Sequence, residues 1–396
     1  MGRRQTMLDP ERPARRHAVP RPAGTVLGVV FAMLLILAPA RGQSVAWVQP
    51  AVSGPSPRSG HAMAYDTARA VTVLFGGYAD VTGWYGDTWE WNGTVWIQRP
   101  VSGPSPRAWH AMAYDAARGV IVLFGGSTGF LNSETWEWDG AAWNQRAVSG
   151  PSARSGHAMA YDAARGVTVL FGGHNIGSYD GETWEWNGMA WTQRTVSGPS
   201  ARYDHAMAND AARGVTVLFG GQSGNTVNGD TWEWIGAAWT RRTVYGPSLR
   251  SGHAMAYDAA RAVTVLFGGG TIGSYNSDTW EWDGSAWTQR LIGGPSPRVI
   301  HAMAYDAARG VTVLFGGYTG TYPYYNGETW GLHVSCYPNC DGSTMAPALN
   351  IADFACFLNR FAAGSSYANC DHSTAPPVLN PLDFTCFLNQ FAAGCP

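Results

Sequence analysis

Residues 58–66 read RSGHAMAYD, and close copies of this nonapeptide recur five more times along the 396-residue chain. The histidine is kept in every copy and stands at positions 61, 110, 157, 205, 253 and 301, so the period is 47 to 49 residues. Each copy continues through VTVLFGG or a close variant, a variable stretch, and then TWEW, which reads TWGL in the last copy. A fixed period of this length is the signature of a repeat architecture and predicts one structural unit per copy.

Each of the first five copies contains four segments that read as β-strands. Residues 62–65 and 71–75 are short, apolar and bounded by Asp, Arg and Gly, which is typical of buried strands. The two Trp of TWEW stand two residues apart and therefore share one face of a third strand. Asn92-Gly93 provides a turn into a fourth strand that carries Trp96. The alternative, a helical solenoid, needs apolar residues three and four apart and fewer glycines.

The double glycine after the second strand and the aromatic residues of the third and fourth strands resemble the Kelch repeat. The resemblance covers six copies, roughly residues 43–333. It implies an all-β fold, a six-bladed Kelch-type β-propeller with four strands in each blade. We assign this propeller to residues 43–334, between a signal peptide (1–42) and a small C-terminal domain (335–396).

The two ends of the repeat array predict how the ring closes. The sixth copy lacks the final Trp-containing strand, and residues 45–49, VAWVQ, resemble the fourth-strand segment VWIQ at residues 95–98. We therefore expect the N-terminal segment to provide the outer strand of the last blade. Closure of this kind removes two open sheet edges.

Charged residues that recur in every copy are expected to serve the blades. A catalytic site needs different groups that converge on one point, whereas an identical residue in each blade indicates a structural task, such as satisfying backbone carbonyls near the channel. This reasoning applies to the six histidines and to two further sets: Arg58, Arg107, Arg154, Arg202, Arg250 and Arg298; and Glu90, Glu137, Glu185, Glu233 and Glu281.

An enzymatic propeller is the alternative to a binding protein. Galactose oxidase, a Kelch-like propeller enzyme, uses a copper site with a cysteine-modified tyrosine, and residues 43–333 contain no cysteine. Residues 178–184, SYDGETW, come within one residue of the Ser-x-Asp-x-Gly-x-Thr-Trp box of sialidase-like propellers, but the other copies lack it. We expect a propeller without a cofactor and keep a carbohydrate-active enzyme, oxidase or glycosidase-like, as the second hypothesis.

The stretches between the double glycine and the third strand differ among copies, and strand alternation places all six on one face. Function usually resides in such loops. They are rich in Tyr, Trp, Asn, Ser and Gly, a composition that suits stacking on sugar rings or docking of a protein. The sequence therefore predicts a glycan or protein ligand, and the candidate contacts are Trp84, Tyr85, Phe130, Tyr179, Tyr275, Tyr322, Tyr324 and Tyr325.

The N-terminal region predicts export. Arginines precede an apolar run at residues 26–37, which is short for a membrane span, and the run ends in Ala38-Pro39-Ala40, a sequence that signal peptidase accepts. We expect a secreted or cell-surface protein without a membrane span after signal removal; an uncleaved anchor is the alternative. The net charge of −2 offers no basic stripe for nucleic acid.

The C-terminal segment holds all six cysteines and is itself duplicated. Residues 339–359 and 369–389 align, and the apolar residues after Asp353 and Asp383 have helical spacing. The arrangement resembles a dockerin, a duplicated calcium-loop-plus-helix module that anchors secreted proteins to a cohesin partner or a surface. The resemblance implies calcium as a cofactor, with these oxygen ligands: Asn339, Asp341, Asp353, Asn369, Asp371 and Asp383.

Disulfides could take the place of the calcium ions in this segment, as expected for an exported, cysteine-rich unit. The symmetry of the duplication suggests Cys340 with Cys356, Cys370 with Cys386, and Cys336 with Cys395. Six cysteines allow 15 pairings.

Overall fold

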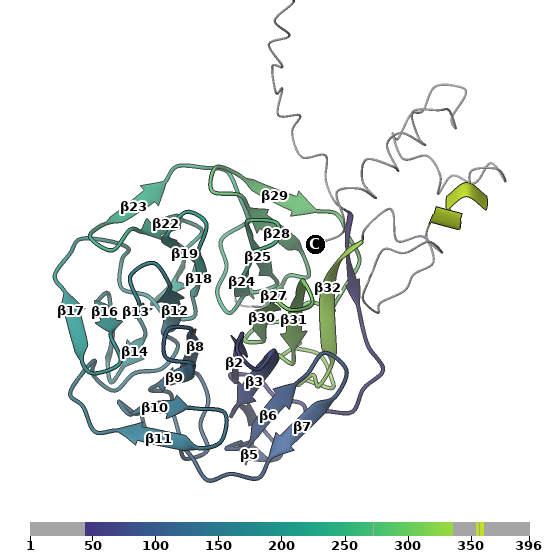
Figure 1. Cartoon of the computed structure of the whole chain (residues 1–396). Coiled ribbons are helices and arrows are strands. Elements are labelled where there is room, and N and C mark those ends of the chain that lie inside the picture. Colours follow the sequence, from purple (N-terminus) through teal and green to yellow (C-terminus); the bar gives the residue numbers. More distant parts are fainter. Residues whose placement is uncertain (1–43, 272, 336–353, 356, 360–396) are drawn as a thin grey trace, which may run out of the picture. The chain divides into compact units, whose positions relative to one another are not determined.

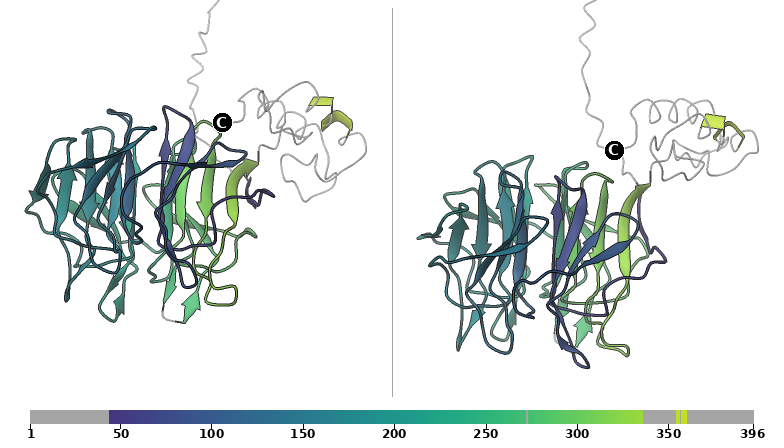
Figure 2. Two further views of the ribbon diagram at one scale, coloured as in Figure 1. Left: turned by 90° about the horizontal axis from the view of Figure 1, so that it is seen from below. Right: turned by 60° about the horizontal axis from the view of Figure 1, so that its bottom comes forward.

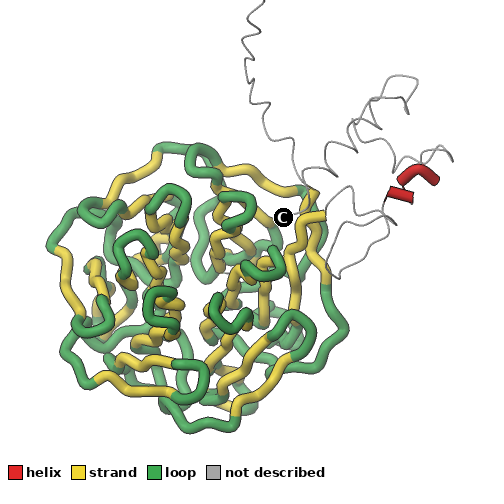
Figure 3. Tube along the Cα trace, in the orientation of Figure 1, coloured by secondary structure: helices red, strands yellow, loops and turns green. Residues whose placement is uncertain are grey.

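Each repeat folds into a four-stranded antiparallel sheet, and six such sheets surround a central axis as the blades of a β-propeller (Figure 1). The computed structural model describes residues 44–271 and 273–335, and five helical residues of the C-terminal segment at 354, 355 and 357–359. The described repeats contain only strands and loops (Figure 3). The predicted all-β, six-bladed propeller is confirmed.

The four strands of a blade run from the axis outward. The inner strands are β2 (Ala62–Asp66), β8 (Ala111–Asp115), β12 (Ala158–Asp162), β18 (Ala206–Asp210), β24 (Ala254–Asp258) and β30 (Ala302–Asp306). The second strands are β3 (Val71–Phe75), β9 (Val120–Phe124), β13 (Val167–Phe171), β19 (Val215–Phe219), β25 (Val263–Phe267) and β31 (Val311–Phe315). The third strands are β6 (Thr88–Trp91), β10 (Thr135–Trp138), β16 (Thr183–Trp186), β22 (Thr231–Trp234), β28 (Thr279–Trp282) and β32 (Thr329–Ser335). The outer strands are β7 (Trp96–Arg99), β11 (Trp143–Arg146), β17 (Trp191–Arg194), β23 (Trp239–Arg242), β29 (Trp287–Arg290) and β1 (Ser44–Val48).

The outer strand of the sixth blade comes from the N-terminal segment, as predicted. β1 pairs antiparallel with β32, with Trp47 opposite Leu332. The indole Nε1 of Trp47 donates a hydrogen bond of 2.9 Å to Thr279 Oγ1 in the fifth blade. The first and last strands of the ring therefore lie in one sheet.

Alternation along the inner strand explains how neighbouring blades pack. In β2, Ala62 and Ala64 face the second blade, where they pack against Met112. Met63 and Tyr65 point to the opposite face and pack against the sixth blade. The small residues of one blade thus receive the large residues of the next, and each interface is filled by side chains of two repeats.

The TWEW motif is explained by contacts that recur around the ring. In the third blade, Thr183 Oγ1 accepts a 2.8 Å hydrogen bond from Trp239 Nε1 of the fourth blade. Trp184 Nε1 donates to Glu182 at 2.9 Å. Glu185 forms an ion pair with Arg165 of its own blade. The predicted structural role of the recurrent glutamates is confirmed.

Short two-stranded ribbons extend four of the loops between second and third strands. They are formed by β4 (Tyr78–Ala79) with β5 (Gly83–Trp84), β14 (His174–Asn175) with β15 (Ser178–Tyr179), β20 (Gln222–Ser223) with β21 (Thr226–Val227), and β26 (Gly270–Thr271) with β27 (Ser274–Tyr275). Because every second strand ends on the same side of the ring, all six loops extend from one face of the propeller, here called the loop face (Figure 2).

Several sequence predictions fall outside the described residues. These are the signal peptide at residues 1–42, the six cysteines with their pairing, and the six calcium ligands of the C-terminal segment. Among the residues that are described, no helix is long and apolar enough to cross a membrane.

Candidate binding site on the loop face

A buried arginine holds both ends of each variable loop. In the first blade, Arg58 is fully buried, and its Nη1 donates to the carbonyl of Gly76 at 2.9 Å. Its Nη2 donates to Asp87 Oδ2 at 2.9 Å, at the far end of the same loop. Burial alone would raise the pKa of Asp87, but the bonds from Arg58 outweigh burial and lower it. The recurrent arginines therefore satisfy backbone carbonyls, as predicted, and fix the base of the loops.

A ring of six backbone hydrogen bonds surrounds the axis on the loop face. Each amide donates to the carbonyl of the equivalent residue in the preceding blade, at distances of 2.6 to 3.0 Å. The six residues all have left-handed backbone angles, with φ between 51° and 67°. In chain order they are Gly60, Trp109, Gly156, Asp204, Gly252 and Ile300. We call this set the mouth ring, and only alternate blades carry a side chain in it.

Steric crowding explains the alternation of the mouth ring. A Cβ atom added to Gly156 would lie 2.8 Å from Asp204 Oδ1, and one added to Gly252 would lie 3.2 Å from Ile300 Cγ1. Each side chain thus lies over the glycine of the preceding blade. Three side chains fit around the axis, and six would clash.

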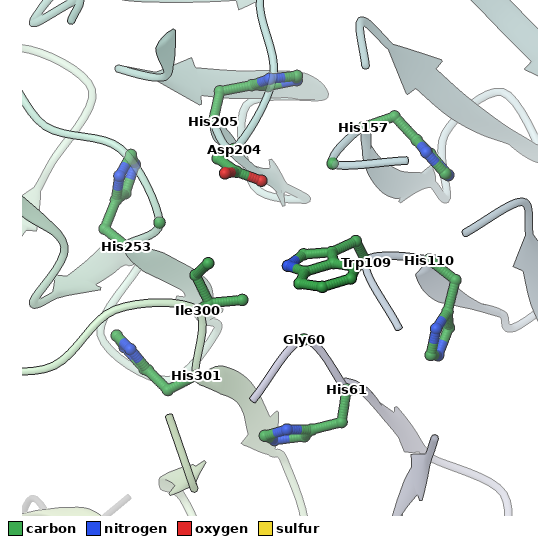
Figure 4. Close-up of a pocket in the computed structure, with 12 residues that line it drawn as sticks. Gly60, His61, Trp109, His110, His157, Asp204, His205, His253, Ile300 and His301 are labelled. Atoms are coloured by element: carbon green, nitrogen blue, oxygen red, sulfur yellow. The ribbon is translucent and has the colours of Figure 1, made fainter. Parts of the chain in front are cut away.

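The mouth ring and the six recurrent histidines line a cavity of about 130 Å³ (Figure 4). The imidazoles are distributed around the axis, one in each blade, and do not converge on a point. Burial, assisted by a neighbouring arginine, lowers the pKa of His61, His157 and His253 to about 3, and the other three histidines shift in the same direction. Within the described residues, no group of three or more His, Cys, Asp or Glu side chains is placed to hold a metal ion.

Asp204 carries the acidic side chain of the mouth ring. Among the described residues, none donates a hydrogen bond to its carboxylate or forms an ion pair with it. Burial raises the pKa of Asp204 to about 7. The neighbouring Arg202 is engaged with Asp230 at 2.6 Å. Asp204 is therefore an uncompensated acidic group at the end of the channel.

Aromatic rings from four consecutive blades are in continuous contact on the loop face. The fifth-blade ring of Tyr275 contacts Tyr318 of the sixth blade, and ring contacts then continue through the first blade to the mouth ring. We call the following set the aromatic arc: Tyr275, Tyr318, Tyr322, Tyr324, Tyr325, Tyr78, Trp84 and Trp109. It joins the outer loops to the channel.

The geometry of the arc combines stacked and edge-on contacts. Tyr318 stacks on Tyr324 with an interplanar angle of 11° and a centroid distance of 6.0 Å. The step between blades is made by Tyr325, whose hydroxyl donates to Asp80 Oδ1 at 2.8 Å. Trp84 then meets Trp109 edge-on at 5.5 Å. The phenol of Tyr322 is 89% exposed, so part of the arc is open to a ligand.

A second, smaller aromatic cluster lies between the third and fourth blades. Tyr179 stacks on Tyr203 with an interplanar angle of 11° and a centroid distance of 5.2 Å, and His174 contacts both rings. Asp180 follows Tyr179 and accepts a 2.9 Å hydrogen bond from Asn175 Nδ2. Burial raises the pKa of Asp180, although Arg154 lies 3.4 Å from its Oδ2.

The eight residues predicted from the sequence occupy different positions. Five of them belong to the aromatic arc: Trp84, Tyr275, Tyr322, Tyr324 and Tyr325. Tyr179 belongs to the second cluster. The ring of Tyr85 lies 3.9 Å from the guanidinium carbon of Arg58, so it contributes to the loop base. Phe130 is 85% exposed and is not among the ring contacts of the arc.

Sequence reasoning missed the residues that reach the axis. Trp109, Asp204 and Ile300, together with Tyr203, lie inside the conserved repeat motif, between its Arg and its His. Three blades carry Ser-Gly at these two positions, and the other three carry Ala-Trp, Tyr-Asp and Val-Ile. This departure from an otherwise constant motif is the signal that could have identified them.

Comparisons with known proteins agree with the architecture. A model of the KLHDC2/KLHL20/DRC7 Kelch-repeats domain matches residues 92–234. The solved structure of YjhT is similar over 70% of this chain and 95% of its own, with a TM-score of 0.55 and 13% sequence identity, a level that supports the fold alone. None of the curated proteins matches this chain. Residues 92–234 are thus similar to a Kelch-repeat domain, and the described repeats form a six-bladed β-propeller.

Proposed function

We propose that this protein is a non-catalytic binding protein whose loop face recognises a glycan or a protein through the aromatic arc. The observation that carries the proposal is the continuous contact of eight aromatic rings from four blades, at positions where the repeats differ. Tyr and Trp rings provide large contact areas at low entropic cost and stack well on the apolar faces of sugars. Arginines hold the loop bases, so the rings are arranged before the ligand arrives.

Export and anchoring belong to the same proposal. Residues 1–42 direct the chain out of the cell, where the propeller binds its ligand. Residues 335–396 attach it to a cohesin-like partner or to a surface, with calcium or disulfides ordering the duplicated segment. The cysteines, all of which lie after residue 335, and the apolar run at residues 26–37 support this part.

The test begins with glycan-array and pull-down screening of the propeller to obtain a ligand. Alanine substitution of Tyr322 or Tyr324 is then expected to weaken binding at least ~10-fold, since exposed aromatic anchors dominate binding energies. Tyr245→Ala is the matched control, because Tyr245 is fully exposed and lies outside the arc. Equal affinities of the wild type and both arc variants, measured by calorimetry, would contradict the proposal.

One observation favours a carbohydrate-active enzyme as the second hypothesis. Asp180 is 9% exposed, its pKa is raised, and it stands where four other blades carry Asn. Perturbed carboxyl groups near a binding surface are candidates for acid–base chemistry. Turnover of a polysaccharide that is lost in Asp180→Asn but kept in Tyr245→Ala would favour the enzyme over the binding protein.

A further inference from the structure

Three non-glycine residues of the mouth ring lie in the left-handed backbone region, which only glycine adopts without strain. Trp109, Asp204 and Ile300 have φ angles of 56°, 51° and 55°. A non-glycine residue at positive φ is uncommon, and a β-branched residue there is an outlier. The glycines of the other three blades close the same ring with equivalent hydrogen bonds. The ring therefore does not require these side chains, and three bulky side chains held in this conformation around one cavity are candidates for function.

The three side chains differ chemically and face one cavity. Figure 4 shows the indole of Trp109, the carboxylate of Asp204 and the aliphatic chain of Ile300 around the axis. The volume of about 130 Å³ is close to the roughly 150 Å³ of a cavity that holds benzene. The site accordingly has room for one small head group.

The electrostatics of the cavity lack a positive charge. The six histidines that line it have lowered pKa values and are neutral at physiological pH. The charge of the buried Arg202 is compensated by its ion pair with Asp230 at 2.6 Å. The Asp204 side chain is only partly exposed and has no partner among the described side chains; a carboxylate in this position is costly, and an external cation would compensate for it.

We propose that the channel mouth binds an organic ammonium group. The carboxylate of Asp204 is the counter-ion, the indole of Trp109 provides a cation–π contact, and Ile300 packs against the alkyl substituents. Aromatic rings combined with a carboxylate suit such cations, because the ring face attracts positive charge while tolerating methyl groups. This site shares Trp109 with the aromatic arc, but Asp204 and Ile300 lie outside the arc, and binding at the mouth does not depend on a polymeric ligand on the arc.

The experiment uses choline and its neutral carbon isostere, 3,3-dimethylbutan-1-ol, titrated into the full chain at pH 8 by calorimetry. Both probes have the same shape, so the difference between their affinities measures how strongly the site recognises the positive charge. Choline is expected to bind at least ~10-fold more tightly than the alcohol, as for a partly desolvated cation–π contact reinforced by a counter-ion. In Asp204→Asn the preference for choline is expected to shrink to about fivefold, which is the part that the cation–π contact of Trp109 provides.

Glycine substitutions measure the contributions of Trp109 and Ile300 to binding. The ring tolerates glycine at these positions, because the other three blades carry it there. Trp109→Gly is expected to weaken choline about fivefold or more through loss of the cation–π contact. Ile300→Gly is expected to weaken choline and the alcohol equally. Ala262→Gly is the matched control, since Ala262 also has a positive φ of 53° but lies in the turn between β24 and β25, on the opposite face.

Three outcomes would overturn the inference: no detectable binding of choline, equal affinity for choline and the alcohol, or full choline affinity in Asp204→Asn. The first two are read from the wild-type protein, so they do not depend on whether a variant folds. Glycan or protein binding on the arc is measured separately. Failure at the mouth is thus distinguishable from failure of the proposed function.

Discussion

At the scale of single residues, the ionisable groups near the axis of the propeller are found in three different electrostatic environments. Each recurrent arginine, such as Arg58, is neutralised by an acidic residue and by backbone carbonyls. Each recurrent histidine, such as His61, is kept neutral by burial, which lowers its pKa. Asp204 follows neither pattern, since its pKa is raised to about 7 and no described side chain compensates it. A group that lowers stability in this way is a candidate for function.

The raised pKa of Asp204 predicts a pH-dependent stability difference between the wild type and Asp204→Asn. The folded protein holds a proton that the unfolded chain releases above its ordinary pKa of 3.8. The free energy of unfolding is therefore highest below pH 4, where Asp204 is protonated in both states. It falls as the pH rises, and the loss is complete above pH 7, where the folded protein must also hold the charged carboxylate. Burial lowers the pKa of the lining histidines, so they carry no charge near pH 7, and Arg202 is paired with Asp230.

Asparagine cannot ionise, so the variant is expected to be more stable than the wild type at pH 8, by on the order of 2 kcal/mol after allowance for partial exposure. The difference should disappear near pH 4. Urea unfolding at pH 4, 6 and 8 measures it. A difference that does not change with pH would show that Asp204 is not perturbed.

At the scale of the element, the third strand explains why TWEW recurs. Its Thr bonds the next blade, its first Trp bonds the acidic residue at the loop end, and its Glu pairs with an arginine of the same blade. In the first blade, Thr88 Oγ1 accepts a hydrogen bond of 2.9 Å from Trp143 Nε1 of the second blade, and both groups are buried. Three of the four positions thus have a hydrogen-bond or ion-pair partner, so a change at any of these three in one blade is expected to lower stability.

Thr88→Val tests this interpretation, because it keeps the shape of the side chain and removes the acceptor of the Trp143 indole. The buried N–H is left without a partner, which should lower the free energy of unfolding by about 1–3 kcal/mol. Thr192→Val in β17 is the control, since that threonine is exposed on an outer strand and a change there should be within about 0.5 kcal/mol. Equal effects in urea denaturation would contradict the role of the inter-blade bond.

At the scale of the molecule, one short strand joins the first and last repeats. β1 completes the sixth blade, and Trp47 fills the same inter-blade position that an outer-strand Trp fills elsewhere. Its ring contacts Phe267 of the fifth blade at 5.2 Å. Closure also brings Tyr325 to Asp80, although 245 positions separate them, so the aromatic arc depends on it.

Removal of residues 44–49 should therefore destabilise the whole propeller. Loss of the strand pairing and of the Trp47 contacts is expected to lower the melting temperature by ~10 °C or more. Chains that begin at residue 43 and at residue 50 are compared by thermal unfolding, with Val48→Ala as a control because Val48 is half-exposed. Unchanged melting of the shorter chain would contradict closure by β1.

The sequence by itself determined the blade, the number of blades and the closing strand. These features follow from the alternation of side chains along each strand, from the turn residues and from the repeat period. Each repeat contains the same signals, so the prediction does not depend on any single copy. It also predicted that the recurrent Arg and Glu are structural, because a residue present in every blade has a task in every blade. Five of the eight predicted aromatic contacts lie in the arc for a similar reason: their loops had to share one face.

Only the tertiary structure decided which rings touch and what lies on the axis. The contacts of Tyr275 with Tyr318 and of Tyr325 with Tyr78 join separate repeats, so their distances depend on the angle between blades. Tyr85 turns inward to Arg58 of its own repeat, a contact that the aromatic composition of the loop does not reveal. The chemistry of the mouth depends on Trp109, Asp204 and Ile300, which meet because a ring brings equivalent positions of alternate blades around one axis. The local sequence determines the fold of each blade. Which residues of different blades meet at the axis is decided only when the ring closes.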